Sequence, residues 1–371
     1  MRMAVILDQL FGMAGSERVA QYVCQEFAEA DIYTLAYNPQ ATFPYFSSRN
    51  IRTTWLNRFV HSTAAFRWSF PVATYVMQSL NLNDYDVVLS CSATVAKYVS
   101  APKGTHVCYC YIPTRALWHF EEYFRPSLRA AIVKPLLSYL RKRDYGAAQR
   151  VDQFIAISEV SKEYIRRYYN RPAAVIHCPV DLTLFRPVKE RKDHYLMVSR
   201  LEGWKKLEYA VEAFNILGLP LRVVGSGPEE GRLRAMAKRN VVFVGNVDDA
   251  TLVTEYSEAR AVIFTPYLEY GLIPLEANAC GTPVICYGKG GVTETMIPVN
   301  RSIRSETPAT AVFFYEQTAA ALMQAVREFE ACEFSRDNLI RHAERWSVPE
   351  FQRRMRAAVM SLVDGSSSFP W

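Results

Sequence analysis

Short apolar runs alternate with segments whose apolar residues recur at helical spacing along most of the chain. The run MAVIL at 3–7 predicts a strand, and RVAQYVCQEFAEA at 18–30 predicts a helix after a Gly-containing turn. The same order of strand and helix returns at 86–99, at 105–112 and at 151–169. Alternation of this kind is typical of a parallel sheet with helices on its faces.

The pattern stops at a stretch rich in proline and charge, CPVDLTLFRPVKERKD at 178–193, which indicates a linker. Strand and helix patterns then resume, beginning with HYLMVSRL and KKLEYAVEAFNIL. The sequence therefore predicts two α/β, doubly wound parallel-sheet domains of the Rossmann type, at 1–188 and 189–348. Ligands of such sheets bind beyond the carboxyl ends of the strands, so two facing sheets would form a central cleft between them.

The composition supports two domains and argues against several other classes of protein. A chain of 371 residues with 50% apolar residues can bury two sizeable cores. The chain contains no run of 18 apolar residues, and its start does not read as a signal peptide, so we expect a cytoplasmic protein. The eight cysteines are scattered without zinc-ligand spacing, so we expect neither a structural metal nor disulfides.

The positive charge is concentrated in the first half of the chain. Residues 1–188 carry 21 Lys and Arg against 14 Asp and Glu, whereas residues 189–371 carry 22 against 23. Basic and aromatic residues are interleaved at 59–75 and at 130–146. This composition fits contact with an anionic membrane or with nucleic acid, and it fits simple solvation of helix faces equally well.

Two cations and two glycines follow predicted strands in the second half. Arg200 and Lys205 lie after a strand in a loop that contains Gly203, and cations at such a place suit a diphosphate, although a solvated helix entrance is the alternative. Gly225 and Gly227 follow the next strand and would bring the backbone close to a ligand. This second signal is weak, because Gly-x-Gly is common in tight turns.

A second candidate site is the stretch EYGLIPLEANACGTPVI at 269–285, which also follows a strand. Gly271 and Leu272 would begin a helix whose free N–H groups favour an anion. Glu276 lies further along that helix and could accept hydrogen bonds from a ribose, while Glu269 in the preceding loop could contact a sugar ring. The alternative is that both carboxylates are helix-terminal charges without a ligand.

Together these motifs describe a site for a nucleotide diphosphate carrying a sugar. Their order along nearly the whole chain resembles the retaining nucleotide-sugar glycosyltransferases of family 4, which have the GT-B fold. Within this family, the motif sequences are most similar to those of bacterial enzymes of surface-polysaccharide assembly, many of which resemble mannosyltransferases that use GDP-mannose. The segments that carry the resemblance are AGSERV, YDVVLSCSATVAK, IAISEVSKEYIRRYY, PVDLTLFRP, VSRLEGWKK, VVGSGPEE, YGLIPLEANACGTPVI and YGKGGVTE.

The resemblance implies an activity. It implies transfer of a hexose, with mannose from GDP-mannose favoured, to a glycan or lipid-linked acceptor in polysaccharide or lipopolysaccharide synthesis. It also implies that no metal or other cofactor is needed, and that a final helix at 349–371 packs back on the first domain. The reaction would take place in the cytoplasm, where the enzyme could contact the inner face of an anionic membrane.

The resemblance also assigns roles to individual residues. Arg200 and Lys205 match the family's diphosphate-binding pair, and Glu276 matches its ribose contact. The other donor-site matches are Gly15 in the first loop, Gly271 and Leu272 near the phosphate, and Asn246 and Val247 near the base.

The chain departs from the family pattern at three places. Glu269 and Glu276 stand seven residues apart instead of eight, so either the loop is one residue shorter or Leu268 occupies the first glutamate's position. Tyr111 replaces a histidine that lies near the donor sugar in the family, and Ala14 replaces a glycine. These changes could mean another donor sugar, or a nucleotide-sugar-binding protein that has lost catalysis.

Further candidates are less specific. Lys97, Tyr111, Arg115 and His119 could face the acceptor, although a lone histidine beside aromatic residues is more often packed. The Asp-Tyr-Asp at 84–86 could hold a metal, but a turn before a strand explains it better. A nucleic-acid-binding protein would explain only the basic first half, so we expect no nucleic-acid partner. A nicotinamide-dependent dehydrogenase is disfavoured because the first loop lacks the glycine fingerprint.

Overall fold

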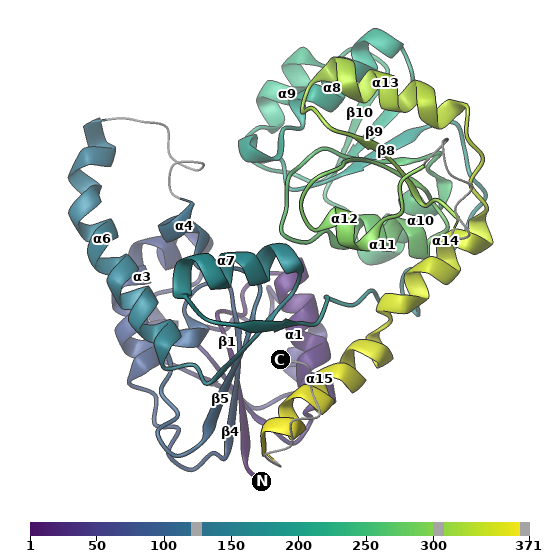
Figure 1. The fold of residues 1–371 in the computed structure, drawn as a ribbon. Helices are drawn as coiled ribbons and strands as arrows, with labels where there is room; N and C mark the ends of the chain where they lie inside the picture. Colours follow the sequence, from purple (N-terminus) through teal and green to yellow (C-terminus); the bar gives the residue numbers. More distant parts are fainter. Residues whose placement is uncertain (120–127, 300–307, 364–371) are drawn as a thin grey trace. The chain divides into compact units, whose positions relative to one another are not determined.

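The structure is a computed structural model, which describes residues 1–119, 128–299 and 308–363 (Figure 1). The chain divides into two compact units. The first unit comprises Met1–Cys178 and the chain from Phe351 onward, and the second comprises Pro179–Glu350. The sequence-based boundary at 188 lies inside the second unit.

The first unit is built on a seven-stranded sheet with the strand order β3-β2-β1-β4-β5-β6-β7. All paired strands are parallel. The central strands are buried along their whole length, which is why the sequence shows continuous apolar runs instead of alternation. The strands are β1 (Met3–Leu7), β2 (Asp31–Thr34), β3 (Ile51–Thr53), β4 (Val87–Ser92), β5 (Thr105–Cys110), β6 (Gln153–Ala156) and β7 (Ala173–Val175).

The helices of the first unit differ greatly in length. Those that begin at a capping side chain include α3, where the Ser62 hydroxyl accepts a hydrogen bond from the Ala65 N–H, and α7, which uses Ser158 in the same way. The helices are α1 (Gly15–Glu26), α2 (Pro44–Ser47), η1 (Trp55–Arg58), α3 (Thr63–Gln78), η2 (Ala96–Tyr98), α4 (Arg115–Trp118), α6 (Leu128–Gln149) and α7 (Glu159–Tyr169).

The second unit has a six-stranded parallel sheet with the order β10-β9-β8-β11-β12-β13. Together the two sheets confirm the predicted pair of doubly wound α/β domains. The strands are β8 (Tyr195–Val198), β9 (Leu221–Val224), β10 (Val241–Gly245), β11 (Val262–Phe264), β12 (Val284–Tyr287) and β13 (Ala311–Phe314). The helices are η3 (Gly203–Lys205), α8 (Glu208–Leu217), α9 (Glu230–Met236), α10 (Asp249–Glu258), α11 (Leu272–Ala279), α12 (Val292–Thr295), α13 (Ala319–Glu330), α14 (Arg336–Ala343) and η4 (Glu344–Trp346).

The last described helix, α15 (Val348–Val363), belongs to the first unit from Phe351 onward. Its side chains bind that unit directly: the Gln352 amide donates to the Tyr22 carbonyl at 3.0 Å, and Arg354 donates to the Val175 carbonyl at 2.9 Å. Arg356 adds a salt bridge to Glu26 in α1. The expected final helix at 349–371 extends beyond this point, and residues 364–371 lie outside the described residues.

Candidate active site

The loops that follow the strands of the second unit form one connected edge of its sheet. Because the strands are parallel, the loops after β8, β9, β10, β11 and β12 all lie at the carboxyl edge. Hydrogen bonds join these loops: Leu201 N–H to Ser226 O (2.9 Å), Gly225 N–H to Gly245 O (2.8 Å), Thr265 Oγ1 to Lys205 O (3.0 Å) and Gly291 N–H to Leu268 O (2.9 Å). The predicted donor-site segments of the second half are therefore neighbours in space.

The two predicted phosphate-binding cations lie in the loop after β8 in different environments. The Arg200 side chain is 67% exposed, and its guanidinium lies 3.4 Å from the Glu202 carboxylate. Lys205, in η3, is only 7% exposed, and its ammonium lies 5.3 Å from the centre of the Trp204 ring. The Arg200 side chain is therefore accessible to an anion from solvent, whereas the Lys205 side chain is largely buried.

Gly225 and Gly227 let two backbones meet at this edge. Gly225 has φ +119°, and a Cβ there would lie 1.9 Å from the Ser199 carbonyl oxygen. A Cβ on Gly227 would lie 2.5 Å from the Leu201 carbonyl oxygen. Both glycines are thus required by the loop that carries Arg200. Asn246 lies close by, because its amide donates to the Ser226 hydroxyl at 2.8 Å.

Substitution of Gly225 by alanine should destabilise the second unit by more than about 1–3 kcal/mol, because the residue combines a positive φ with a backbone clash. Gly231 in α9 provides the matched control, since nothing lies within 4 Å of its Cβ position. Gly231→Ala should be neutral or stabilising by about 0.5–1 kcal/mol. Thermal unfolding of both variants checks the difference; equal melting temperatures would contradict it.

The segment that carries Glu269 is held by a second glycine contact. A Cβ on Gly291 would lie 2.0 Å from the Glu269 carbonyl oxygen, so the turn before α12 rests directly on this loop. Glu269 is buried. Gly271 is the N-cap of α11, and Leu272 is the first residue of that helix, as the sequence predicts.

Glu276 lies half-buried on α11, where the Tyr256 hydroxyl donates to its Oε2 at 2.8 Å. Tyr256 is fully buried at the end of α10. This tyrosine fixes the orientation of the carboxylate and was not singled out from the sequence. An aromatic residue with a polar tip on an otherwise apolar helix face was the signal available for it.

In the first unit, Tyr111 holds the start of α1. Its hydroxyl donates to the Ser16 carbonyl at 3.0 Å, and burial raises the pKa of Tyr111 well above its usual value. Gly15 is the first residue of this helix, so Tyr111 contacts the loop that the sequence assigns to the donor. Glu17, next to it, accepts a hydrogen bond from Ser16, and burial raises the pKa of its carboxyl group.

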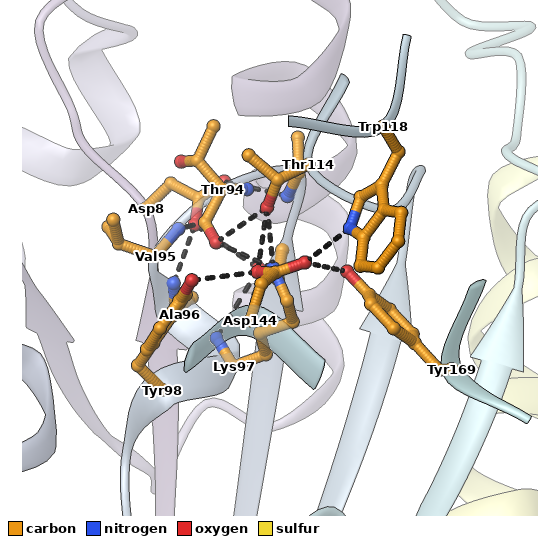
Figure 2. A network of polar contacts seen from close by, with 12 residues as sticks. Asp8, Thr94, Val95, Ala96, Lys97, Tyr98, Thr114, Trp118, Asp144 and Tyr169 are labelled. Carbon is orange, nitrogen blue, oxygen red and sulfur yellow. Dashed lines mark hydrogen bonds and ion pairs between the residues drawn. The ribbon is translucent and has the colours of Figure 1, made fainter. Parts of the chain in front are cut away.

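Lys97 does not face an acceptor, which corrects the sequence-based expectation. Its side chain is fully buried, and its ammonium lies 2.8 Å from the Asp144 carboxylate (Figure 2). The same ammonium donates to the Thr94 carbonyl and to the Thr114 hydroxyl, at 2.8 and 2.7 Å. A charge neutralised inside the core is not available to a surface ligand.

Asp144 is the central acceptor of this buried network. A second buried carboxylate, that of Asp8, lies nearby. Asp8, directly after β1, accepts hydrogen bonds from the backbone N–H groups of residues 93–96. Neither residue was singled out from the sequence, although each is an isolated acid beside an apolar or basic run. The donors to Asp144 besides Lys97 are Tyr98 (2.8 Å), Thr114 (3.1 Å), Trp118 (2.7 Å) and Tyr169 (2.7 Å).

The remaining acceptor candidates lie around α4. The His119 ring is buried edge-on against Tyr164 and Tyr168, with ring centres 4.7 and 5.5 Å away. Arg115 begins α4, and its carbonyl accepts the His119 N–H at 2.9 Å. His119 is therefore a packed residue, and the segment that follows it, 120–127, lies outside the described residues.

The Asp-Tyr-Asp motif at 84–86, considered above as a possible metal site, lies at the amino end of β4 in the first sheet. Asp86 accepts a hydrogen bond from the Arg2 backbone N–H at 2.6 Å, immediately before β4. The motif thus forms a turn before a strand. Among residues 1–119, 128–299 and 308–363, no three His, Cys, Asp or Glu side chains are grouped as ligands for a metal ion.

Two units, each with a parallel sheet flanked by helices, are the architecture of the GT-B fold. The solved structures agree. A sucrose-phosphate synthase from Thermosynechococcus elongatus superimposes with a TM-score of 0.75 at 18% identity, covering 99% of this chain and 100% of that one. HepE of Anabaena, solved in complex with UDP and glucose, gives a TM-score of 0.72 at 16% identity over 97% of this chain and 100% of that one.

The family models are more specific than the fold. Residues 13–184 match the model of Glycosyltransferase Family 4, and residues 185–346 match the model of Glycosyl transferases group 1. The chain therefore belongs to the GT-B glycosyltransferases of the family 4 type.

Sequence relatives are distant. The D-rhamnosyltransferase WbpZ of Pseudomonas aeruginosa is 26% identical over 47% of this chain and 48% of its own length, so the match spans about half of that relative. An uncharacterized glycosyltransferase of Methanocaldococcus jannaschii, MJ1607, is 25% identical over 72% of this chain and 73% of its own length. The mannosyltransferase ALG2 of Dictyostelium discoideum is 22% identical over 65% of this chain.

Proposed function

We propose that the protein transfers a hexose, with retention of configuration and without a metal ion, from a nucleotide diphosphate sugar to a glycan or lipid-linked saccharide. The observation that carries this proposal is the connected loop edge of the second unit. There the loop of Arg200 and Lys205 is bonded to the end of β11, and α11 begins seven residues further on at Leu272. Cations and free helix amides at one edge suit a diphosphate.

The difficult step is loss of the nucleoside diphosphate from the anomeric carbon. Negative charge grows on the leaving phosphate, and Arg200, Lys205 and the backbone N–H groups at Gly271 and Leu272 would stabilise it. Preorganised groups of this kind contribute most where water is excluded. The acceptor hydroxyl would attack from the side that the phosphate leaves, and a phosphate oxygen would take its proton.

GDP-mannose is the favoured donor, and bacterial surface polysaccharide is the favoured product. Two of the relatives are a D-rhamnosyltransferase and a mannosyltransferase, which supports mannose or a related hexose as the transferred sugar. HepE, in contrast, was solved with UDP, so a UDP-sugar is the donor to test against GDP-mannose. Calorimetry or thermal shift with GDP-, UDP- and ADP-sugars in the absence of metal separates these donors, since a ligand that binds the native state raises its melting temperature. Stabilisation by none of them would contradict the proposal.

Glu276 is the proposed ribose contact, and Tyr256 positions it. Glu276→Gln should weaken nucleotide binding about tenfold, because a charge-assisted hydrogen bond is lost. Tyr256→Phe should give a smaller loss, since the carboxylate remains but is no longer oriented. Calorimetric Kd values for the nucleotide check both variants. An unchanged Kd in Glu276→Gln would remove this residue from the ribose.

A nucleotide-sugar-binding protein without catalysis is the less favoured alternative. Two observations support it: Tyr111 replaces the family's histidine, and its hydroxyl donates a hydrogen bond to the Ser16 carbonyl. Such a protein would bind the donor but would neither transfer nor slowly hydrolyse it. Detection of released nucleoside diphosphate therefore decides between the two functions.

We place the reaction in the cytoplasm, at the inner face of a membrane that holds the acceptor. Among the residues that the structure describes, no helix is both long and apolar enough to cross a bilayer.

A further inference from the structure

More than half of the exposed large apolar side chains of the described residues lie on or next to one group of helices in the first unit. Fifteen exposed large apolar residues occur among the described residues; seven of these lie on η1, α3 and α6, and an eighth, Phe59, directly follows η1. Trp68 is 88% exposed, Phe59 67% and Trp55 58%. We call η1 with the adjoining Phe59, α3 and the described side chains of α6 the aromatic face; its other exposed apolar members are Val72, Tyr75, Leu136, Tyr139 and Tyr145.

The exposed residues of α3 form a single stripe. Trp68, Val72 and Tyr75 follow one another at intervals of four and three residues, which places them on one side of a helix. The opposite side of α3 is buried in the core of the unit, where Phe66 and Val76 lie. The stripe is therefore not a remnant of the core, and burial within this unit does not account for it.

The helices α3 and α6 lie side by side in Figure 1, and contacts between their side chains join them. The hydroxyls of Tyr75 and Tyr139 are hydrogen-bonded to each other. The Arg143 guanidinium lies 3.5 Å from the centre of the Tyr75 ring and donates to the Gln78 amide oxygen at 3.1 Å. The exposed aromatic residues of the two helices are thus parts of one surface.

Every exposed charge on this face is positive. Residues 55–78 contain no Asp or Glu, and residues 134–150 contain only Asp144, which is fully buried against Lys97. The cations of the two segments are Arg58, Arg67, Lys134, Arg141, Lys142, Arg143 and Arg150. The surface is therefore complementary to an anionic partner and not to a second copy of itself, because like charges would face each other.

An open hollow of about 400 Å³ lies at the α4 end of the face. It is lined by Trp118, Arg141, Lys142 and Tyr145. Trp118 is fixed there because its indole N–H donates to Asp144 and the Arg141 side chain donates to the Leu117 carbonyl, at 2.7 and 2.6 Å. Two cations beside two aromatic rings suit a phosphate headgroup whose glycerol or acyl part contacts the rings.

We propose that the aromatic face docks the enzyme on a bilayer that contains anionic phospholipid. Tryptophan and tyrosine favour the boundary between headgroups and acyl chains, and Lys and Arg are attracted by anionic headgroups. A folded nucleic acid would use the cations but would leave the stripe of Trp68 and Val72 in water. The inference rests on the proposed function, because a lipid-linked acceptor lies in such a bilayer.

Cosedimentation of the full chain with vesicles tests the proposal, using phosphatidylcholine alone and phosphatidylcholine mixed with phosphatidylglycerol. The protein should bind the mixed vesicles and release them at high salt. Trp68→Ser should weaken this binding about tenfold, as expected for one large apolar side chain. Arg67→Glu should weaken it about fivefold or more, as expected for the loss of one cation near the surface.

Matched substitutions in the second unit serve as controls. Ile216→Ser removes an apolar residue that is 61% exposed from α8, and Arg327→Glu reverses an exposed charge on α13. Both should leave vesicle binding unchanged. All variants should keep the wild-type melting temperature and nucleotide Kd, so a failure of docking is distinguishable from a failure of the proposed transferase function.

Three outcomes would overturn the proposal. The first is equal binding to neutral and mixed vesicles, or none to either. The second is binding that survives Trp68→Ser and Arg67→Glu. The third is that the protein forms a concentration-dependent dimer or binds an RNA probe tightly, and that Trp68→Ser abolishes this association but not vesicle binding. The aromatic face would then bind that partner and not the bilayer.

Discussion

Arg200→Ala should lower kcat/KM for sugar transfer by about 10²–10³, which corresponds to about 3–4 kcal/mol, with the fold unchanged. The loss is large because the guanidinium is proposed to meet charge that develops only in the transition state. The fold should survive because the side chain is 67% exposed and makes only a long ion pair with Glu202. Steady-state kinetics with the donor identified by calorimetry measures the effect, and thermal unfolding checks the fold.

The control for this experiment is Arg239→Ala. Arg239 is an exposed cation just before β10, at the amino end of the sheet and therefore away from the proposed site. Its substitution should leave kcat/KM unchanged. Lys205→Ala should reduce activity as strongly as Arg200→Ala, and its melting temperature must be measured because this side chain is buried. Wild-type turnover in both site variants would refute the role of the pair.

The second large effect is expected on stability, from the buried ion pair of the first unit. Lys97→Met leaves the Asp144 carboxylate without its cation in a site that is fully buried. Breaking such a pair from one side costs about 3–5 kcal/mol, because a buried charge is left uncompensated. Asp144→Ala should cost at least as much, since the four hydroxyl and indole donors around it lose their acceptor as well.

Thermal or urea unfolding followed by circular dichroism measures this loss in the transition of the first unit. Lys162→Met is the matched control: Lys162 forms the same kind of ion pair with Glu159, but at the surface. Exposed pairs contribute little, so this variant should unfold as the wild type does. A Lys97→Met variant with the stability of the control would show that the buried network is not a source of stability.

The sequence was sufficient for the α/β fold because its signals are local. Apolar runs such as that of β1 and the helical periodicity after it are properties of a few neighbouring residues. The placement of Gly271 and Leu272 at the start of α11 follows from the same local pattern. The domain boundary was less accessible, because the chain leaves the first unit at Cys178 and returns to it at Phe351.

Local sequence patterns could not predict which residues surround each site residue in the folded protein. The glycine motif at Gly225 and Gly227 suggested a ligand, but the backbone it approaches is that of residues 199–201. Tyr111 was expected beside a sugar, and its hydroxyl binds the carbonyl of Ser16 in another element. Such contacts join residues that are far apart in the chain, and no single-sequence periodicity encodes them.

By itself, the sequence determined the two parallel sheets. It also determined that cations, glycines and carboxylates are concentrated after the strands of the second half. Both features can be recognised from short stretches of residues that are neighbours in the chain. Only the tertiary structure decided which charges remain available. Lys97 was expected to face the acceptor and is instead buried and neutralised by Asp144, whereas Arg200 remains exposed. The physical reason is that burial and pairing depend on which distant segment packs against a side chain, and desolvation makes that choice decisive for a charge.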